Sequence, residues 1–143
     1  MANETLIANE ASMANNSGQG KGTIVPEVVS DKFNWGAFLL SWIWGLGNKS
    51  YITLTMLATV VLVFIPFVNM LAGMAQLGLA IWFGIKGNEW AWQNKKFESI
   101  EAFHAYQKKW AIAGTVLAIL GIICAIAIIF LVMAVAMSGI SAD

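Results

Sequence analysis

The longest apolar run of the chain covers residues 111–137, AIAGTVLAILGIICAIAIIFLVMAVAM, and contains no charge, amide or proline. As an α-helix at about 1.5 Å per residue, this run extends roughly 40 Å. That length is enough to cross a hydrocarbon core of about 30 Å with some tilt. The pattern therefore predicts one long C-terminal transmembrane helix over 111–137, followed by a non-cytoplasmic tail over 138–143.

Two further apolar stretches precede this span. Residues 51–86 are interrupted by Pro66 and Asn69, and Pro66 disfavours helix at the residue before it. We therefore predict a membrane helical hairpin over 51–86, whose short arms either cross a thinned bilayer or enter and return on one side. Residues 33–48, FNWGAFLLSWIWGLGN, are too short for a span and rich in tryptophan. This composition predicts an interfacial or re-entrant helix.

Polar residues flank these apolar stretches. Residues 1–32 are rich in Asn, Ser and Gly, which predicts a disordered cytoplasmic tail. Within this tail, residues 18–23, GQGKGT, lack the spacing of a nucleotide-binding phosphate loop. Residues 87–110 combine charges with apolar residues at helical spacing, which predicts an amphipathic cytoplasmic helix leading into the last span. The predicted fold class is an all-α membrane protein.

The distribution of lysine predicts the orientation of the protein. The chain carries eight Lys, no Arg and eight acidic residues, so its formal net charge of zero excludes a large basic face for nucleic acid. The lysines nearest the predicted spans all lie on one side of them: Lys49, Lys86, Lys95, Lys96, Lys108 and Lys109. Because lysine-rich flanks stay cytoplasmic, we predict a cytoplasmic N-terminus and a C-terminus outside.

Small and polar side chains recur at intervals of three or four on two predicted helices. They are Asn69, Gly73 and Gln76 on the second hairpin arm, and Gly114, Ala118, Gly121 and Ala125 on the last span. Such faces let helix backbones approach closely, so we predict that the two faces pack together. The alternative is that Asn69 and Gln76 line a pore in an oligomer.

Residues able to carry chemistry are scarce in the predicted membrane segments. Apart from Lys86 at the end of the hairpin, no Asp, Glu, Lys or His falls inside them, so we predict no enzymatic activity, catalytic residue, cofactor or metal site. The tryptophans lie near predicted cytoplasmic boundaries, where they anchor helices. A cluster in the polar segment is a candidate surface for a partner protein or anionic lipid, formed by Asn88, Trp90, Trp92, Lys95 and Lys96.

Four blocks of the sequence resemble a family of small bacterial integral membrane proteins that carry a domain of unknown function. They are residues 15–27, 33–52, 65–70 and 84–110, with NWGAFLL followed by WIWGLGN, and GNEWAWQNKKFES, as the most specific motifs. The resemblance implies a multi-pass protein of the bacterial inner membrane and carries no assigned chemistry.

Together, the pattern and the resemblance predict a non-catalytic adaptor or assembly subunit that presents a tryptophan-rich platform at the cytoplasmic face. The expected partners are membrane lipids and a membrane protein or further copies of the chain. The alternative is a homo-oligomeric channel or lipid-perturbing protein.

Overall fold

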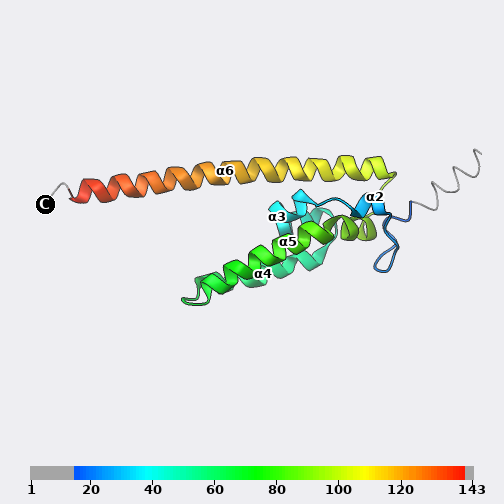
Figure 1. Ribbon diagram of the computed structural model, residues 1–143, viewed down its shortest axis with the longest axis horizontal. Helices are drawn as coiled ribbons and strands as arrows, with labels where there is room; N and C mark the ends of the chain where they lie inside the picture. The colour runs from blue at the N-terminus through cyan, green and yellow to red at the C-terminus, as the bar shows by residue number, and fades with distance from the viewer. Residues whose placement is uncertain (1–14, 141–143) are drawn as a thin grey trace, which may run out of the picture.

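The computed structural model describes residues 15–140, with side chains through Ser138. Within this part of the chain the secondary structure is helical, as predicted, and contains no strand. The elements are α2 (Glu27–Ser30), α3 (Trp35–Gly47), the 3₁₀ helix η1 (Tyr51–Leu54), α4 (Thr55–Val60), the 3₁₀ helix η2 (Val61–Phe64), α5 (Asn69–Asn94) and α6 (Ile100–Ile140). Figure 1 shows α6 and the α4–α5 pair extending in the same general direction. The helix α3 lies between α6 and the α4–α5 pair.

The helix α3 coincides with the short tryptophan-rich stretch and begins at a side-chain cap. The Asn34 side chain accepts a hydrogen bond from the backbone N–H of Ala37 at 2.8 Å, which satisfies one of the unpaired donors of the first turn. Inside the helix, Ser41 has a φ of 42° and a ψ of −106°, so the helix is kinked at this residue. The segments of α3 before and after Ser41 therefore run in different directions.

The predicted hairpin is present, with its turn at Pro66. The first arm consists of η1, α4 and η2, and the second arm is α5, which packs against both α4 and η2. The Asn69 side chain accepts from the backbone N–H of Met70 at 2.8 Å and thereby supports the start of α5. The second arm does not end at Lys86 as the sequence suggested, because α5 continues without a break to Asn94.

The helix α6 joins two segments that the sequence analysis separated. It begins after Ser99, whose hydroxyl accepts from the backbone N–H of Ala102 at 3.1 Å, and it contains 41 residues. At about 1.5 Å per residue it is roughly 61 Å long. Its N-terminal part packs on α3, whereas all residues from Ile119 to Ser138 are exposed. Of the tail predicted over 138–143, residues 138–140 belong to α6, and residues 141–143 lie outside the described part of the chain.

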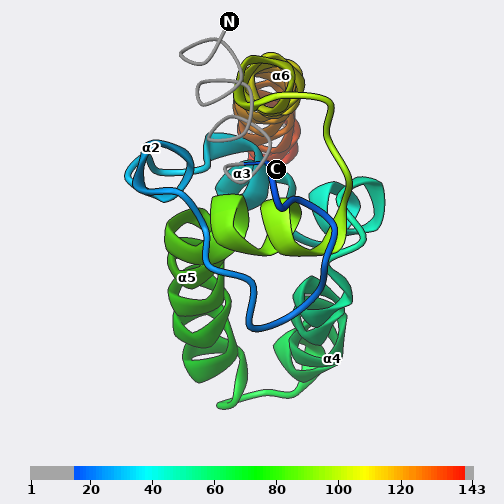
Figure 2. The same ribbon diagram turned by 90° about the vertical axis from the view of Figure 1, so that its right-hand side faces the viewer.

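The segment before α3 is ordered on the surface of α5 from residue 15 onward and is not a free tail, which corrects the prediction for residues 15–32. We call residues 15–26 the strap. The backbone N–H of Gly18 donates to the carbonyl of Trp92 at 2.7 Å. The Ser17 hydroxyl accepts from the backbone N–H of Phe97 at 2.9 Å. Figure 2 shows the strap crossing the end of α5 toward the α4 side. The predicted disorder of residues 1–14 lies outside the described part.

A core of aromatic side chains holds the strap, α3 and the adjoining ends of α5 and α6 together. We call this unit, residues 15–50 and 83–114, the head. Trp44, Phe83, Trp92 and Phe103 are fully buried in it. The Trp92 ring meets the Phe103 ring edge-on at 5.5 Å between centroids. Full burial of side chains of this size is the main hydrophobic contribution to stability here.

Candidate functional site

Buried amide side chains join α3, α5 and α6 at the centre of the head. The Asn34 Nδ2 donates to the Asn88 Oδ1 at 2.6 Å and to the Gln107 Oε1 at 3.1 Å. Gln107 also accepts from the Trp44 indole N–H at 2.9 Å and donates to the Asn48 Oδ1 at 2.7 Å. Among the described residues, no buried side-chain nitrogen or oxygen lacks a hydrogen-bond partner. A fully paired network of this kind favours one arrangement of the three helices.

Close backbone approach surrounds the amide network. A Cβ atom at Gly87 of α5 would lie 2.7 Å from the Cβ of Ala37 in α3. A Cβ atom at Gly36 would lie 2.7 Å from the Cβ of Trp110 in α6. Both distances are too short for a normal carbon contact, so glycine is needed at each position. These glycines therefore allow α3, α5 and α6 to pack closely around the amide network.

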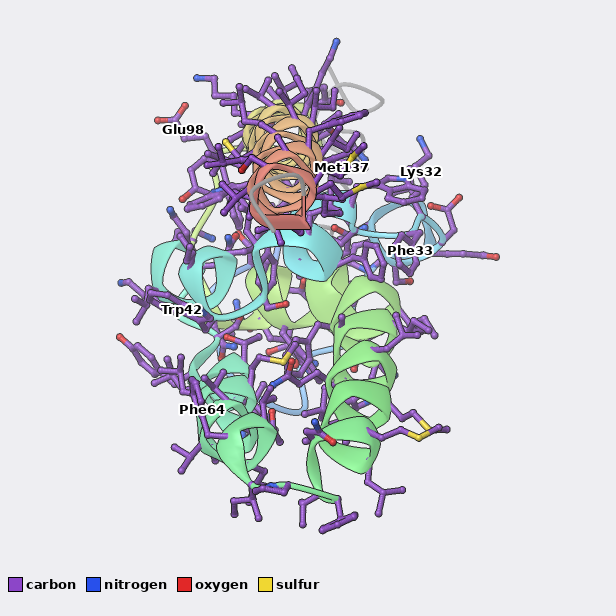
Figure 3. The ribbon with its side chains drawn as sticks, turned by 90° about the vertical axis from the view of Figure 1, so that its left-hand side faces the viewer. Lys32, Phe33, Trp42, Phe64, Glu98 and Met137 are labelled. Carbon is purple, nitrogen blue, oxygen red and sulfur yellow. The ribbon has the colours of Figure 1, made fainter. Side chains whose placement is uncertain are left out.

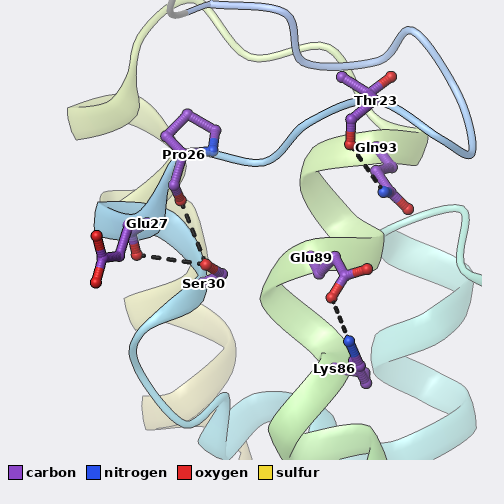
Figure 4. Close-up of polar contacts among 7 residues, drawn as sticks. All are labelled: Thr23, Pro26, Glu27, Ser30, Lys86, Glu89 and Gln93. Carbon is purple, nitrogen blue, oxygen red and sulfur yellow. Dashed lines mark hydrogen bonds and ion pairs between the residues drawn. The ribbon is translucent and has the colours of Figure 1, made fainter.

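The strap places Lys21 at the tip of a turn above the end of α5. The backbone N–H of Gly20 donates to the carbonyl of Gln93 at 2.8 Å. The Gln93 side-chain amide donates to the carbonyl of Thr23 at 3.1 Å (Figure 4). Gly22 has a φ of +92°, the left-handed value that a tight turn of this kind requires. Both ends of the turn are thus fixed to one residue of α5.

Lys49 ends α3 in a conformation that usually selects glycine. Its φ is +56°. The backbone N–H of Ser50 donates to the carbonyl of Gly45 at 2.8 Å, and that of Lys49 donates to Leu46 at 3.3 Å. This pair of bonds is a Schellman cap, in which the left-handed residue is commonly glycine. A side chain costs free energy at this position, and strained residues of this kind are concentrated at functional sites.

A cavity of about 680 Å³ lies between the strap turn, the end of α3 and α5. Its lining includes Lys21, Lys49, Tyr51, Trp82 and Trp90. The Trp82 and Trp90 rings meet edge-on at 5.0 Å between centroids. Within the described residues, the ammonium groups of both lysines have no hydrogen-bond or ion-pair partner.

The acidic residue of the cavity is already neutralised. The carboxylate of Glu89 lies 2.7 Å from the ammonium group of Lys86, one turn earlier in α5 (Figure 4). Both side chains are partly exposed, so this pair contributes little to stability. Its consequence for the cavity is that the two unpaired lysines determine the sign of the local charge.

The structure corrects the predicted tryptophan surface. Trp92 is fully buried and Asn88 is 5% exposed, so both belong to the interior. Lys95 donates to the carbonyl of Gly47 at 3.1 Å and lies 3.8 Å from the Tyr106 ring centroid. Trp90 is half-buried in the cavity lining, and only Lys96 of the predicted set is exposed.

Other tryptophans of the head are exposed. Trp35 and Trp42, both on α3, are 56% and 36% exposed. The Trp35 ring packs edge-on against Phe33, with centroids 5.0 Å apart. In Figure 3, Trp42 and Lys32 project outward on opposite sides of the head. Aromatic surface is therefore presented by α3, and Trp90 and Trp92 of α5 contribute little to it.

The predicted packing of the small faces also differs in the structure. Gly114 is buried, but its neighbours are Leu39 and Leu40 of α3. Around Gly73 and Gly121 a Cβ atom would meet nothing within 4 Å. Asn69 and Ala125 are exposed, and Gln76 and Ala118 are partly buried. On α6, Gly114 therefore meets α3, Ala118 is partly covered, and Gly121 and Ala125 are exposed.

Comparison of the chain with protein-family models, with curated proteins and with solved structures finds no match. The family resemblance described above therefore stays a prediction. Within the described residues, no three His, Cys, Asp or Glu side chains lie together as a metal site would require. The presence of Lys21 and Lys49 in the lining of one cavity was not predicted, although the glycines on both sides of Lys21 indicate a turn.

Proposed function

We propose that the protein is a small integral membrane protein that acts without catalysis, as an adaptor or assembly subunit with its head at the cytoplasmic surface. The observation that supports the membrane location is the exposure of apolar side chains along α6. Each residue from Ile119 to Ser138 is exposed, and the most apolar 18-residue window of the helix has no buried residue. In water such a helix exposes its aliphatic side chains at a large free-energy cost, which a bilayer removes.

The dimensions of the hairpin support the same proposal. By length and composition, α5 and α6 are both able to cross a membrane. From Asn69 to Ile85, α5 extends about 26 Å. The first arm has 14 residues, and its two 3₁₀ turns lengthen it to about 25 Å. These matched arms suit a locally thinned bilayer.

The angle of α3 supports an interfacial position for this helix. The axis of α3 is bent by 117° from that of the first arm, over Tyr51–Phe64. If the arm stands upright in the bilayer, α3 lies within about 30° of the membrane plane. Its exposed Trp35 and Trp42 then lie where tryptophan is favoured, at the headgroup boundary.

Alkaline extraction of membranes tests the location. The wild-type chain is expected to stay in the membrane pellet. The double variant Ile122→Lys and Ile126→Lys is expected to be extracted more readily than the wild type, because each lysine at the centre of a span costs about 3 kcal/mol and the hairpin is then the remaining anchor among the described residues. The control, Ile24→Lys with Val28→Lys, changes exposed apolar residues of the segment before α3 and should stay in the pellet. Release of the wild-type chain by alkali would overturn the proposal.

Isolation from native membranes in mild detergent tests the adaptor role. A membrane protein that co-purifies in fixed stoichiometry and can be cross-linked to the head supports it. The second candidate, a homo-oligomeric channel, is favoured by Gln76, which lines a cavity of about 460 Å³ between α3 and the hairpin arms. If the purified protein gives single-channel currents and these vanish in Gln76→Leu, the channel would be the better supported function and the adaptor proposal would fail.

A further inference from the structure

We propose that the cavity between the strap turn and α5 binds the phosphate-bearing headgroup of an anionic phospholipid. This inference rests on the proposed membrane location and assigns a ligand class to the head. Lys21 and Lys49 supply two ammonium groups without partners among the described residues, and the carboxylate of Glu89 is paired with Lys86. Lysine contacts a phosphate as a point charge. The two positive charges of Lys21 and Lys49 exceed the single negative charge of one phosphodiester.

The apolar part of the lining favours a lipid over a free phosphate ion. Tyr51, Ile52, Trp82 and Trp90 line the cavity together with the two lysines. A free phosphate ion gains nothing from these aromatic and aliphatic surfaces, whereas the glycerol and first acyl carbons of a lipid bury against them. The volume of about 680 Å³ lies in the usual range for a small-molecule site.

The depth of the cavity agrees with a lipid headgroup. Counting from Asn69 at the hairpin tip, Trp82 lies about 20 Å along α5 and Trp90 about 32 Å. A hydrocarbon core is about 30 Å thick, so these two residues bracket its cytoplasmic boundary when the hairpin is inserted. Phosphates of the cytoplasmic leaflet are found at this level.

The backbone at Lys49 is an independent observation in favour of the site. Glycine is the common residue at this left-handed cap, and the chain carries lysine there in spite of the steric cost. Among the described residues, no hydrogen bond or ion pair of the Lys49 side chain offsets this steric strain. A ligand in the cavity gives the side chain a role that glycine cannot supply.

Lipid retention by the purified full-length protein tests the proposal. Mixed micelles containing phosphatidylglycerol or phosphatidylcholine are titrated, and bound lipid is counted by native mass spectrometry. We expect a preference for phosphatidylglycerol that falls about ten- to thirtyfold in the double variant Lys21→Gln and Lys49→Gln. The matched control, Lys108→Gln with Lys109→Gln, removes the same charge from exposed positions of α6 outside the cavity and should keep the preference. An equal loss in both variants would overturn the site.

The variant Lys49→Gly separates ligand binding from folding. Glycine relieves the left-handed backbone, so the thermal midpoint should rise while binding of phosphatidylglycerol falls. A higher midpoint with unchanged binding would exclude Lys49 from the site and overturn the proposal.

Two further experiments distinguish a failure of the lipid assignment from a failure of the proposed membrane location. Displacement of phosphatidylglycerol by millimolar inorganic phosphate would show a free-phosphate site and overturn the lipid assignment. If the protein does not float with phosphatidylcholine vesicles, the proposed membrane function fails. If it floats and shows no preference for phosphatidylglycerol, only this inference fails.

Discussion

Gln107 shows how one side chain fixes the relation of several helices. Its amide accepts from Asn34 and Trp44 and donates to Asn48, and it is 8% exposed. The amphipathic helix predicted over 87–110 contains this glutamine, but helical spacing alone does not distinguish a surface amide from a buried one. The partners lie 59 to 73 positions away along the chain, so only the folded head reveals the network.

Replacing Gln107 by leucine is expected to lower the free energy of unfolding by about 2–4 kcal/mol, because several buried partners lose their hydrogen bond. The measurement is unfolding of the purified protein in mixed micelles, followed by tryptophan fluorescence. Gln76→Leu is the matched control, since that side chain makes no hydrogen bond to another described residue. It should change the free energy by less than about 1 kcal/mol. Equal losses would contradict the role given to the network.

At the scale of elements, α3 and α5 cross where both helices carry small residues. Gly87 faces Ala37 with no room for a further methyl group, whereas Gly73 on the same helix faces open space. The sequence pattern identified small residues as packing sites, yet it paired the helices incorrectly. A period of three to four residues shows which positions share a face, but it carries no information on which neighbour that face meets.

Gly87→Ala is expected to destabilise the head by about 1–3 kcal/mol, because the added methyl group forces α3 and α5 apart. Gly73→Ala introduces the same methyl group into the same helix and should be neutral or stabilising by up to about 1 kcal/mol. Thermal unfolding of both variants in one detergent gives the comparison. A loss at position 73 as large as that at 87 would show that helix propensity, and not the crossing, determines the effect.

The strap closes the C-terminal end of α5, whose last carbonyls have no partner within the helix. Glycines in the strap supply the backbone N–H donors, with Gly18 bonded to Trp92 and Gly20 to Gln93. Its composition is that of a disordered tail, which explains the prediction. The order comes from long-range hydrogen bonds to α5 and from burial of Ser17, and composition cannot reveal these contacts.

Ser17→Ala is expected to lower stability by about 1–3 kcal/mol, because the backbone N–H of Phe97 loses its acceptor in a buried position. Hydrogen exchange of the strap amides, read by mass spectrometry, should accelerate in the same variant. Ser30→Ala removes an exposed hydroxyl that makes only long contacts of 3.4 Å and serves as the control. Unchanged exchange in Ser17→Ala would indicate that the strap is held by its backbone contacts alone.

For the whole molecule, the head lies at one end, and the hairpin tip and α6 both extend away from it (Figure 1). The sequence predicted the long apolar helix and the break at Pro66, because both depend on local composition. It could not predict that α5 continues into the head, since Asn88 is buried by contacts with Asn34 and Lys32 and Gln93 by contacts with the strap. Lysines gather at the head, while the tip carries exposed Phe64 and Phe67.

This arrangement predicts that one face of the membrane carries the head and the other carries the hairpin tip and the C-terminus. Single cysteines at Gln19, Phe64 and Ser141, in a Cys124→Ser background, report the orientation when intact cells are treated with a membrane-impermeant thiol reagent. We expect labelling at positions 64 and 141, and labelling at 19 only after permeabilisation, because lysine-rich flanks stay cytoplasmic. Protection at 64 with labelling at 141 would show a re-entrant hairpin and leave the orientation intact. Labelling at 19 with none at 141 in intact cells would reverse it.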